Sequence, residues 1–275
     1  MPIIDSAPAL DQSVTMSDSQ SGPDVTAPTG GRRFVDEDLR GARFIGCDLR
    51  GAVMRGADLA GAELDSPWLL DGESTLLVNG VDVAPYVDAE LNRRFPGREQ
   101  RRAGSPAGLR AAWAGVEQAW GSAVRRARAM PEGSVDASVD GEWSFAQTLR
   151  HLVMATDVWY RRAILGVEQP YHPIGQPIAE FEADGNDMSV FAAERPSFEE
   201  VLRVRAEHVT MVRDFLAGVS DPDLLAERTN PWAPDRSETV LSCVHVILDE
   251  EWEHLRYAER DLDVLDARAA DAGRA

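Results

Sequence analysis

The chain has 275 residues and a formal net charge of −19, and 44% of its residues are hydrophobic, as in soluble globular proteins. The negative charge argues against nucleic acid as a partner, because the chain would repel phosphate backbones, and no apolar run of about 18 residues predicts a membrane span. Two cysteines, Cys47 and Cys243, form no disulfide framework, and with no secretory signal we expect a cytoplasmic protein.

The first segments of the chain are a polar tail and a repeat. Residues 1–30 are rich in Ser, Asp, Pro, Gly and Thr, and this composition predicts a disordered tail because little apolar surface is available for burial. Large apolar residues then recur at every fifth position from Phe34 to Leu64, and glycines recur with the same spacing. A period of five fits neither a helix nor a flat strand, but it fits a square coil with one repeat on each side.

The repeat resembles the pentapeptide-repeat family, whose motif Ala-Asp-Leu-x-Gly occurs at Ala57–Gly61. The resemblance implies a short right-handed quadrilateral β-helix within residues 31–88, with small residues such as Cys47 pointing inward. Such a short coil is expected to dock on another surface. Asn79-Gly80 between apolar residues predicts a type I′ hairpin that extends or caps the coil, and the polar residues 89–105 predict a linker.

From about Pro106 the apolar period becomes helical. We predict helices over residues 107–130, 144–165, 197–217 and 239–268, and Ser144 and Ser197 each open a capping-box sequence. The connection between the second and third helices is long, so we expect it to be ordered. The chain is therefore predicted to be mainly α, with a four-helix bundle over residues 106–275.

Three side chains on two of these helices are candidate metal ligands. Glu250 and His254 are four residues apart, which places them on one helix face about 6 Å apart along the axis. His151 lies in an apolar stretch of the second helix and is expected to face the interior. Two imidazoles and a carboxylate suit a divalent first-row ion with open coordination positions. The alternatives are a core histidine and a solvated Glu-His pair, and Glu251 remains a substitute for Glu250.

Two longer segments resemble the signatures of DinB-like metal-dependent four-helix bundles. The segment from Gly141 to Val153 is similar to the signature of the second helix, with Trp143-Ser144 preceding the His151-Leu152 pair. The segment from Asp249 to Ala258 is similar to the signature of the fourth helix. The resemblance implies His151, Glu250 and His254 as ligands of zinc or nickel, similar to the His-Glu-His variant of mycothiol-dependent maleylpyruvate isomerases.

The same resemblance implies the function. Members of this family are S-transferases or isomerases that use a low-molecular-weight thiol, so we expect such an enzyme with a small-molecule substrate, with mycothiol as the thiol and with a hydrolase as a variant. A homodimer is expected by analogy. His172 in the long connection and Tyr257 on the last helix are candidate catalytic residues, although a loop histidine beside a proline turn and a packed tyrosine are the alternatives.

A function of another class stays open beside the enzyme. The chain would then be a non-catalytic pentapeptide-repeat interaction protein, either a DNA mimic or a dimerisation module, with a degenerate or structural metal site. Among the other candidate side chains, Arg205 is expected to be solvated, His208 is expected to pack or to lie at the surface, and His245 and Cys243 are expected to pack.

Overall fold

The structure is a computed structural model that describes residues 31–70, 74–178, 180–192 and 194–274. The predicted disordered tail, residues 1–30, lies outside the described residues. The chain divides near residue 62 into two compact units, the repeat and a larger unit that runs from Glu63 to the C-terminal region.

The repeat has a regular backbone with the predicted period. Five glycines recur at positive φ values between 62° and 76°, at Gly41, Gly46, Gly51, Gly56 and Gly61. Bends and turns recur with them, but residues 31–62 contain no strand, so the quadrilateral β-helix stays a prediction. The large apolar side chains are between 45% and 60% exposed in this unit, at Phe34, Leu39, Phe44, Leu49, Met54 and Leu59. Cys47 is exposed as well, so the expected inward position of its side chain is not found.

The larger unit begins with a short 3-10 turn, η1 (Pro67–Leu70), and the predicted hairpin. Strands β1 (Leu77–Val78) and β2 (Val81–Asp82) pair antiparallel. Asn79 and Gly80 have φ values of 52° and 81°, as a type I′ turn requires. The hairpin prediction is therefore confirmed.

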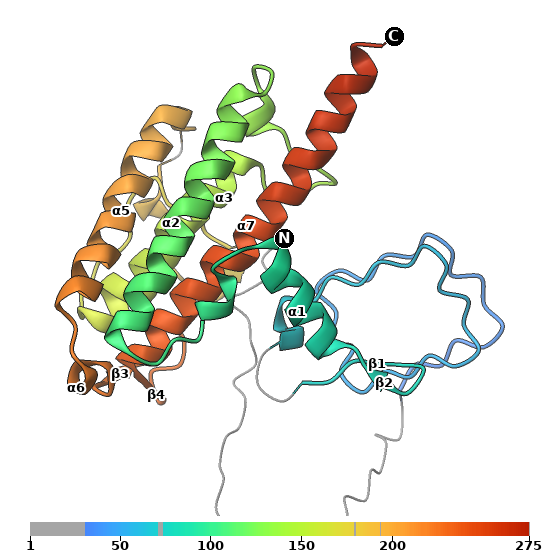
Figure 1. Cartoon of the computed structure of the whole chain (residues 1–275), viewed down its shortest axis with the longest axis horizontal. Helices are drawn as coiled ribbons and strands as arrows, with labels where there is room; N and C mark the ends of the chain where they lie inside the picture. The colour runs from blue at the N-terminus through green and yellow to red at the C-terminus, as the bar shows by residue number, and fades with distance from the viewer. Residues whose placement is uncertain (1–30, 71–73, 179, 193, 275) are drawn as a thin grey trace, which may run out of the picture. The chain divides into compact units, whose positions relative to one another are not determined.

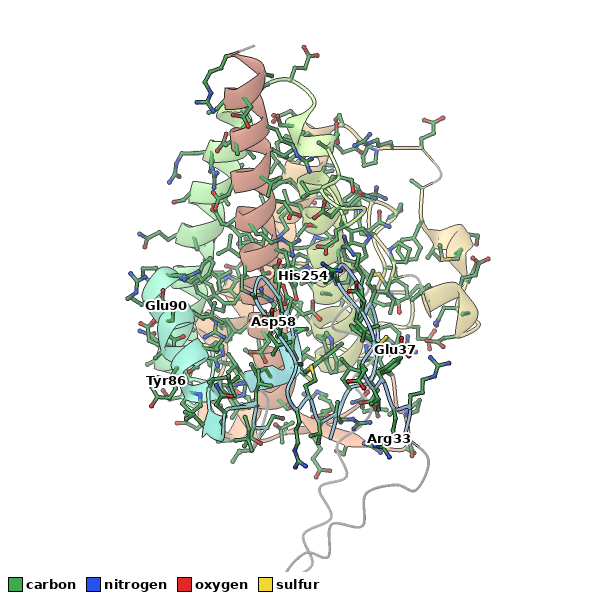
Figure 2. All side chains as sticks on the ribbon, turned by 90° about the vertical axis from the view of Figure 1, so that its right-hand side faces the viewer. Arg33, Glu37, Asp58, Tyr86, Glu90 and His254 are labelled. Carbon is green, nitrogen blue, oxygen red and sulfur yellow. The ribbon has the colours of Figure 1, made fainter. Side chains whose placement is uncertain are left out.

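A helix that the sequence analysis did not predict follows the hairpin. Helix α1 (Ala84–Arg94) and the 3-10 turn η2 (Arg98–Gln100) lie across the segment in which the linker was expected. Tyr86 and Glu90 mark α1 in Figure 2, and Tyr86 is exposed. Arg98 is buried, and its Nη1 donates to Asp88 Oδ1 at 2.8 Å. This contact ties α1 to η2, and Arg98 Nη2 also lies 3.7 Å from Glu253 Oε1 on a later helix.

The four predicted long helices are all present. They are α2 (Pro106–Ala129), α3 (Phe145–Thr156), α5 (Phe198–Gly218) and α7 (Val240–Ala272), and α3 continues as the π-helix η4 (Asp157–Ile164). Ser144 and Gln147 form the complete capping box that was predicted, and the Ser197 side chain accepts from the backbone N–H of Glu200. The caps explain why α3 and α5 begin where they do.

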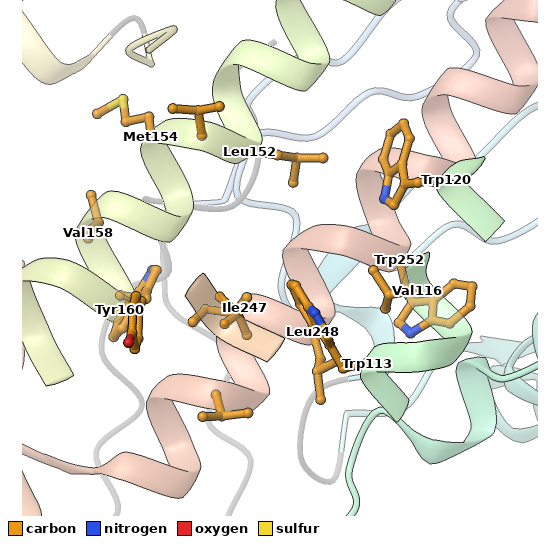
Figure 3. Packing of buried hydrophobic residues seen from close by; sticks show 14 of the residues in the cluster. Trp113, Val116, Trp120, Leu152, Met154, Val158, Tyr160, Ile247, Leu248 and Trp252 are labelled. Atoms are coloured by element: carbon orange, nitrogen blue, oxygen red, sulfur yellow. The ribbon is translucent and has the colours of Figure 1, made fainter. Parts of the chain in front are cut away.

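These helices form a bundle. Helix α2 packs on α5 and α7, and α3 packs on the same two helices, so α2 and α3 lie on one diagonal and α5 and α7 on the other. Figure 1 shows the four helices side by side, with the C-terminal part of α7 extending beyond the others. Trp113 from α2 and Leu248 and Trp252 from α7 are fully buried between them (Figure 3). Burial of each such side chain stabilises the fold by about 1.5–3 kcal/mol.

The connections within the bundle are ordered where the structure describes them. The long connection between η4 and α5, called the crossover below (residues 165–196), contains α4 (Glu180–Ala183) and the 3-10 turn η5 (Met188–Val190). Tyr171, Phe181 and Phe191 form an aromatic cluster in it. The short helix α6 (Asp221–Leu224) and the antiparallel strands β3 (Glu227–Thr229) and β4 (Ser237–Thr239) lie between α5 and α7. The 3-10 turn η3 (Ser134–Asp136) lies between α2 and α3. None of the described helices combines the length and the apolar character that crossing a membrane requires.

Candidate metal centre

Three buried side chains from α3 and α7 meet in the bundle. His151 Nε2 lies 3.4 Å and His254 Nε2 lies 3.2 Å from Oε2 of Glu250. One ligand atom of each residue lies within 4.8 Å of the others, so that a single ion can contact all three. The residues are 2%, 3% and 1% exposed for His151, His254 and Glu250, respectively. The predicted set of metal ligands is therefore brought together.

Local structure explains this convergence. Glu250 and His254 are one turn apart on α7, so both side chains point to the same side of that helix. His151 lies two turns after the capping box of α3, and α3 packs against α7, which carries the other two ligands. The site therefore depends on the packing of α3 against α7.

The hydrogen-bonding state of the site fits a bound cation. Among the described residues, none forms a hydrogen bond with either carboxylate oxygen of Glu250 or with Nε2 of His254. Burial acts to raise the pKa of Glu250, but the two facing imidazoles outweigh it and lower the pKa, so the group is ionised at neutral pH. Burial lowers the pKa of His254, which favours the neutral imidazole. A buried, ionised carboxylate beside the lone pairs of imidazole nitrogens is a set of ligands that suits a divalent ion.

An aromatic side chain covers the site. The Trp143 ring lies 4.6 Å from the His151 ring and 6.0 Å from the His254 ring, measured between centroids. It stacks on His254 with an interplanar angle of 22°. The sequence analysis named Trp143 only as part of the motif before α3, and the structure adds that the ring shields the imidazoles.

The structure distinguishes the two adjacent carboxylates that the sequence left as alternatives. Glu251 is buried, and both of its oxygens accept from Nη2 of Arg205 on α5. Glu250 is the carboxylate that lies in the ligand group. The expectation that Arg205 is solvated is wrong, because this arginine is buried in the bundle and neutralises Glu251.

The candidate catalytic residue His172 lies in the crossover beside a second polar cluster. Its backbone N–H donates to Asp157 Oδ2 at 2.7 Å, and its ring lies 6.0 Å from the His208 ring. His208 is buried, which is the packed alternative of the two left open by the sequence, and its Nε2 donates to Asp157 Oδ1 at 2.9 Å. The catalytic role of His172 stays a prediction, and local sequence gave no signal that Asp157 would be its partner.

The second candidate, Tyr257, lies next to the ligand group. Its ring is 6.1 Å from that of His254, and burial raises the pKa of its phenol. The hydroxyl donates to Asp65 Oδ1 at 3.2 Å, and Arg256 donates to both oxygens of the same carboxylate. Asp65 was not a candidate in the sequence, because it is far from α7 along the chain. The role of Tyr257 stays a prediction.

The two remaining candidates on α7, His245 and Cys243, pack as expected. His245 Nε2 donates to the backbone carbonyl of Ala103 at 2.9 Å, and burial lowers the pKa of its imidazole. Cys243 is buried, and burial raises the pKa of its thiol to about 12, so it is not a reactive thiolate.

Comparison with known proteins gives two family matches. The family model described as DinB superfamily matches residues 115–258, which is more than half of the chain. The model described as pentapeptide repeats (8 copies) matches residues 38–66. The comparison with curated proteins found no match, and neither did the comparison with solved structures. Both resemblances drawn from the sequence are confirmed, in the predicted order along the chain.

Proposed function

The chain belongs to the DinB superfamily, and from this premise we propose that it is a metal-dependent enzyme that uses a low-molecular-weight thiol. It either transfers this thiol to a small electrophilic substrate or isomerises the substrate with the thiol as a cofactor. Zinc or nickel is the proposed ion, and mycothiol is the proposed thiol. The observation that carries the proposal is the ionised Glu250 carboxylate, buried between His151 and His254 without a charged partner among the described residues.

The residues of the site have distinct proposed roles. His151, Glu250 and His254 would hold the ion, and three protein ligands leave positions open for a small molecule. A bound divalent ion would supply positive charge that favours the thiolate form of a thiol. Trp143 covers the two imidazoles and limits the access of water to them. Metal content alone does not define the reaction, so the assignment of thiol chemistry follows from the family.

Two further side chains are proposed to serve the substrate. The phenol of Tyr257 keeps its proton at neutral pH because burial raises its pKa, and donation of that proton to a substrate oxygen would require the hydroxyl to exchange Asp65 for the substrate. His172 Nδ1 accepts from the backbone N–H of Ile174 at 3.2 Å, which leaves the proton of the neutral imidazole on Nε2. Burial lowers the pKa of His172 and favours this neutral form.

The test is a thiol-transfer assay with matched histidine variants. Purified protein is loaded with zinc or nickel and incubated with mycothiol or glutathione and an alkyl halide, and the conjugate is quantified by mass spectrometry. We expect metal-dependent conjugation that His254→Ala abolishes together with bound metal. His245→Ala, on the same helix but bonded to Ala103, should keep both. A loaded wild-type protein that accelerates conjugation with neither thiol would contradict the proposal.

The repeat supports a second proposed function for its own part of the chain. Its large apolar side chains are exposed at five-residue intervals, which is unfavourable in water and favours a protein partner. We propose that the repeats form the quadrilateral coil when two copies of the chain associate as a dimer. Light scattering should give a dimer for the wild type and a monomer for the double variant Leu39→Asp/Leu49→Asp. A wild-type monomer at high concentration would contradict this role.

A further inference from the structure

The crossover contacts the ring nitrogen of the candidate metal ligand His151 that does not face Glu250. His151 Nδ1 lies 3.3 Å from the backbone carbonyl oxygen of Gln176. A carbonyl oxygen only accepts hydrogen bonds, so Nδ1 carries the proton of the neutral imidazole and Nε2 carries the lone pair. Nε2 is the atom that faces Glu250. The crossover thus selects the tautomer of His151 that a metal ion requires.

Arg150, the residue before this ligand, holds the same stretch of backbone. Its Nε donates to the carbonyl of Ile174 at 2.8 Å, and its Nη2 reaches the carbonyl of Gly175 at 3.4 Å. In the other direction, the backbone N–H of Gln176 donates to the carbonyl of Arg150 at 3.2 Å. Residues 174–176 are therefore bonded to Arg150 of α3 directly before the carbonyl that contacts His151.

Asp157 fixes the beginning of the stretch. It is fully buried at the start of η4, and its Oδ2 accepts from the backbone N–H of His172. Its Oδ1 accepts from His208 Nε2 at 2.9 Å and from Arg161 Nη1 at 3.0 Å. This carboxylate therefore links the crossover to both α3–η4 and α5, and its position is set by donors from two helices.

Close packing leaves little freedom between these two anchors. A Cβ atom at Gly175 would lie 3.0 Å from the Phe191 ring and 3.4 Å from Cβ of Met154 on α3. It would also lie 3.2 Å from the carbonyl oxygen of His172. Only glycine fits here without displacing a neighbour, so the backbone of residues 172–176 lies directly against α3.

We propose that residues 172–176 are a positioning segment for the metal ligand His151, and that Arg150 and Asp157 are positioning residues that act through the carbonyl of Gln176. The proposal rests on the metal site of the proposed function and deepens it. Outer hydrogen bonds of this kind orient a ligating imidazole, and their loss typically lowers metal affinity by about 10- to 100-fold. Neither Arg150 nor Asp157 belongs to the ligand group itself.

The main test compares two arginines that make the same type of contact. Arg150→Met removes the donors to the carbonyls of Ile174 and Gly175. Arg228→Met is the matched control, because Arg228 is also half-buried and donates to two backbone carbonyls, those of Ile164 at the end of η4 and of Glu227 in β3. Zinc affinity is measured by competition with a chromophoric chelator, and the thermal stability of the metal-free proteins is measured in parallel.

We expect Arg150→Met to bind zinc about 10- to 100-fold more weakly than the wild type, and Arg228→Met to bind it unchanged. Arg150→Lys, which can still reach one carbonyl, should recover part of the affinity. Equal zinc affinity of Arg150→Met and wild type overturns the positioning proposal and leaves the metal site intact. A wild-type protein that takes up no zinc refutes the proposed function as well.

A second measurement reads the tautomer directly in the metal-free wild-type protein. Nitrogen-15 NMR of the histidine side chains should show the His151 proton on Nδ1. In Arg150→Met the two tautomers should mix, whereas in Arg228→Met the Nδ1 form should persist. A proton on Nε2 of His151 in the wild type would overturn the proposal, whatever the metal affinity of the variants.

Discussion

Two adjacent carboxylates on α7 have the same burial and opposite surroundings. Glu250 and Glu251 are each 1% exposed. Glu251 points across the bundle to α5, where Arg205 supplies a positive charge. Glu250 points to α3, where it meets two imidazoles and no arginine among the described residues. One carboxylate is neutralised by the protein itself, and the other lacks a permanent positive charge.

The difference follows from the cost of burying charge. An ionised carboxylate in a protein interior is tolerated only when it is paired or coordinates a metal. The Arg205–Glu251 pair meets this requirement within the chain, so this region has a structural role. The Glu250 carboxylate has only two titratable imidazoles as partners, and a divalent cation would supply the missing permanent charge, which gives this region its proposed function.

The largest effect is expected when the internal pair is broken. Arg205→Met leaves Glu251 buried without its partner and should lower the free energy of unfolding by about 3–5 kcal/mol, measured by urea denaturation. The double variant Arg205→Met/Glu251→Met should unfold with nearly wild-type stability, because a buried ion pair is often replaceable by apolar side chains. If the double variant were as unstable as the single one, the charge of Glu251 would not be the cause.

A smaller effect is expected from supplying the cation that Glu250 lacks. Zinc at about 100 times its dissociation constant should stabilise metal-free wild-type protein by about 2.7 kcal/mol, because it binds the folded state. Thermal unfolding with and without chelator measures this shift. His254→Ala should show no such stabilisation, and an equal shift in that variant would mean that zinc binds elsewhere.

The pH dependence of metal binding separates the two regions further. An imidazole with the ordinary pKa of about 6.5 is mostly protonated at pH 5.5 and would lose metal affinity by about tenfold there. Burial lowers the pKa of His254, so its neutral form, and with it metal binding, should persist to a lower pH. Affinity measured between pH 5 and 8 should begin to fall below pH 6.5, and a steep fall already near pH 7 would contradict this. Burial raises the pKa of the Glu251 carboxyl while Arg205 opposes this shift, so titration of that pair is followed separately, through the stability of the metal-free protein.

The smallest effect is expected for an exposed ion pair on the same helix as Arg205. Arg203 Nη1 lies 2.7 Å from Glu207 Oε1 at the surface of α5. Arg203→Met should change the free energy of unfolding by no more than about 1 kcal/mol in urea denaturation. A loss as large as that of Arg205→Met would show that burial does not explain the difference between the two arginines.

The sequence predicted the bundle well, because its helices carry local signals. The capping serines at 144 and 197 and the apolar period are readable within one turn of chain, and the helices begin there. Helix α1 was missed because Ala84–Arg94 is largely polar and is held by contacts with later residues such as that of Asp88 with Arg98. The π-helix η4 was missed because the apolar period does not reveal a change in hydrogen-bond register.

The ligand group was predictable in part. The spacing of Glu250 and His254 and the resemblance of two helices indicated the three ligands, and the structure brings them together. The choice between Glu250 and Glu251 was not readable, because it depends on Arg205, a residue on another helix. The place of His172 depends likewise on Asp157, which approaches it only through the fold of the crossover.

The most direct test of the account is the metal content of three proteins purified without added metal and without a histidine-rich tag. Elemental analysis should find about one divalent ion per chain in the wild type and in Glu251→Gln, and almost none in Glu250→Gln, since a neutral amide there replaces an ionised ligand. The two variants make the same chemical change at adjacent positions. Full metal content in Glu250→Gln, or a metal-free wild type that does not take up zinc or nickel when it is supplied, would contradict the central claim.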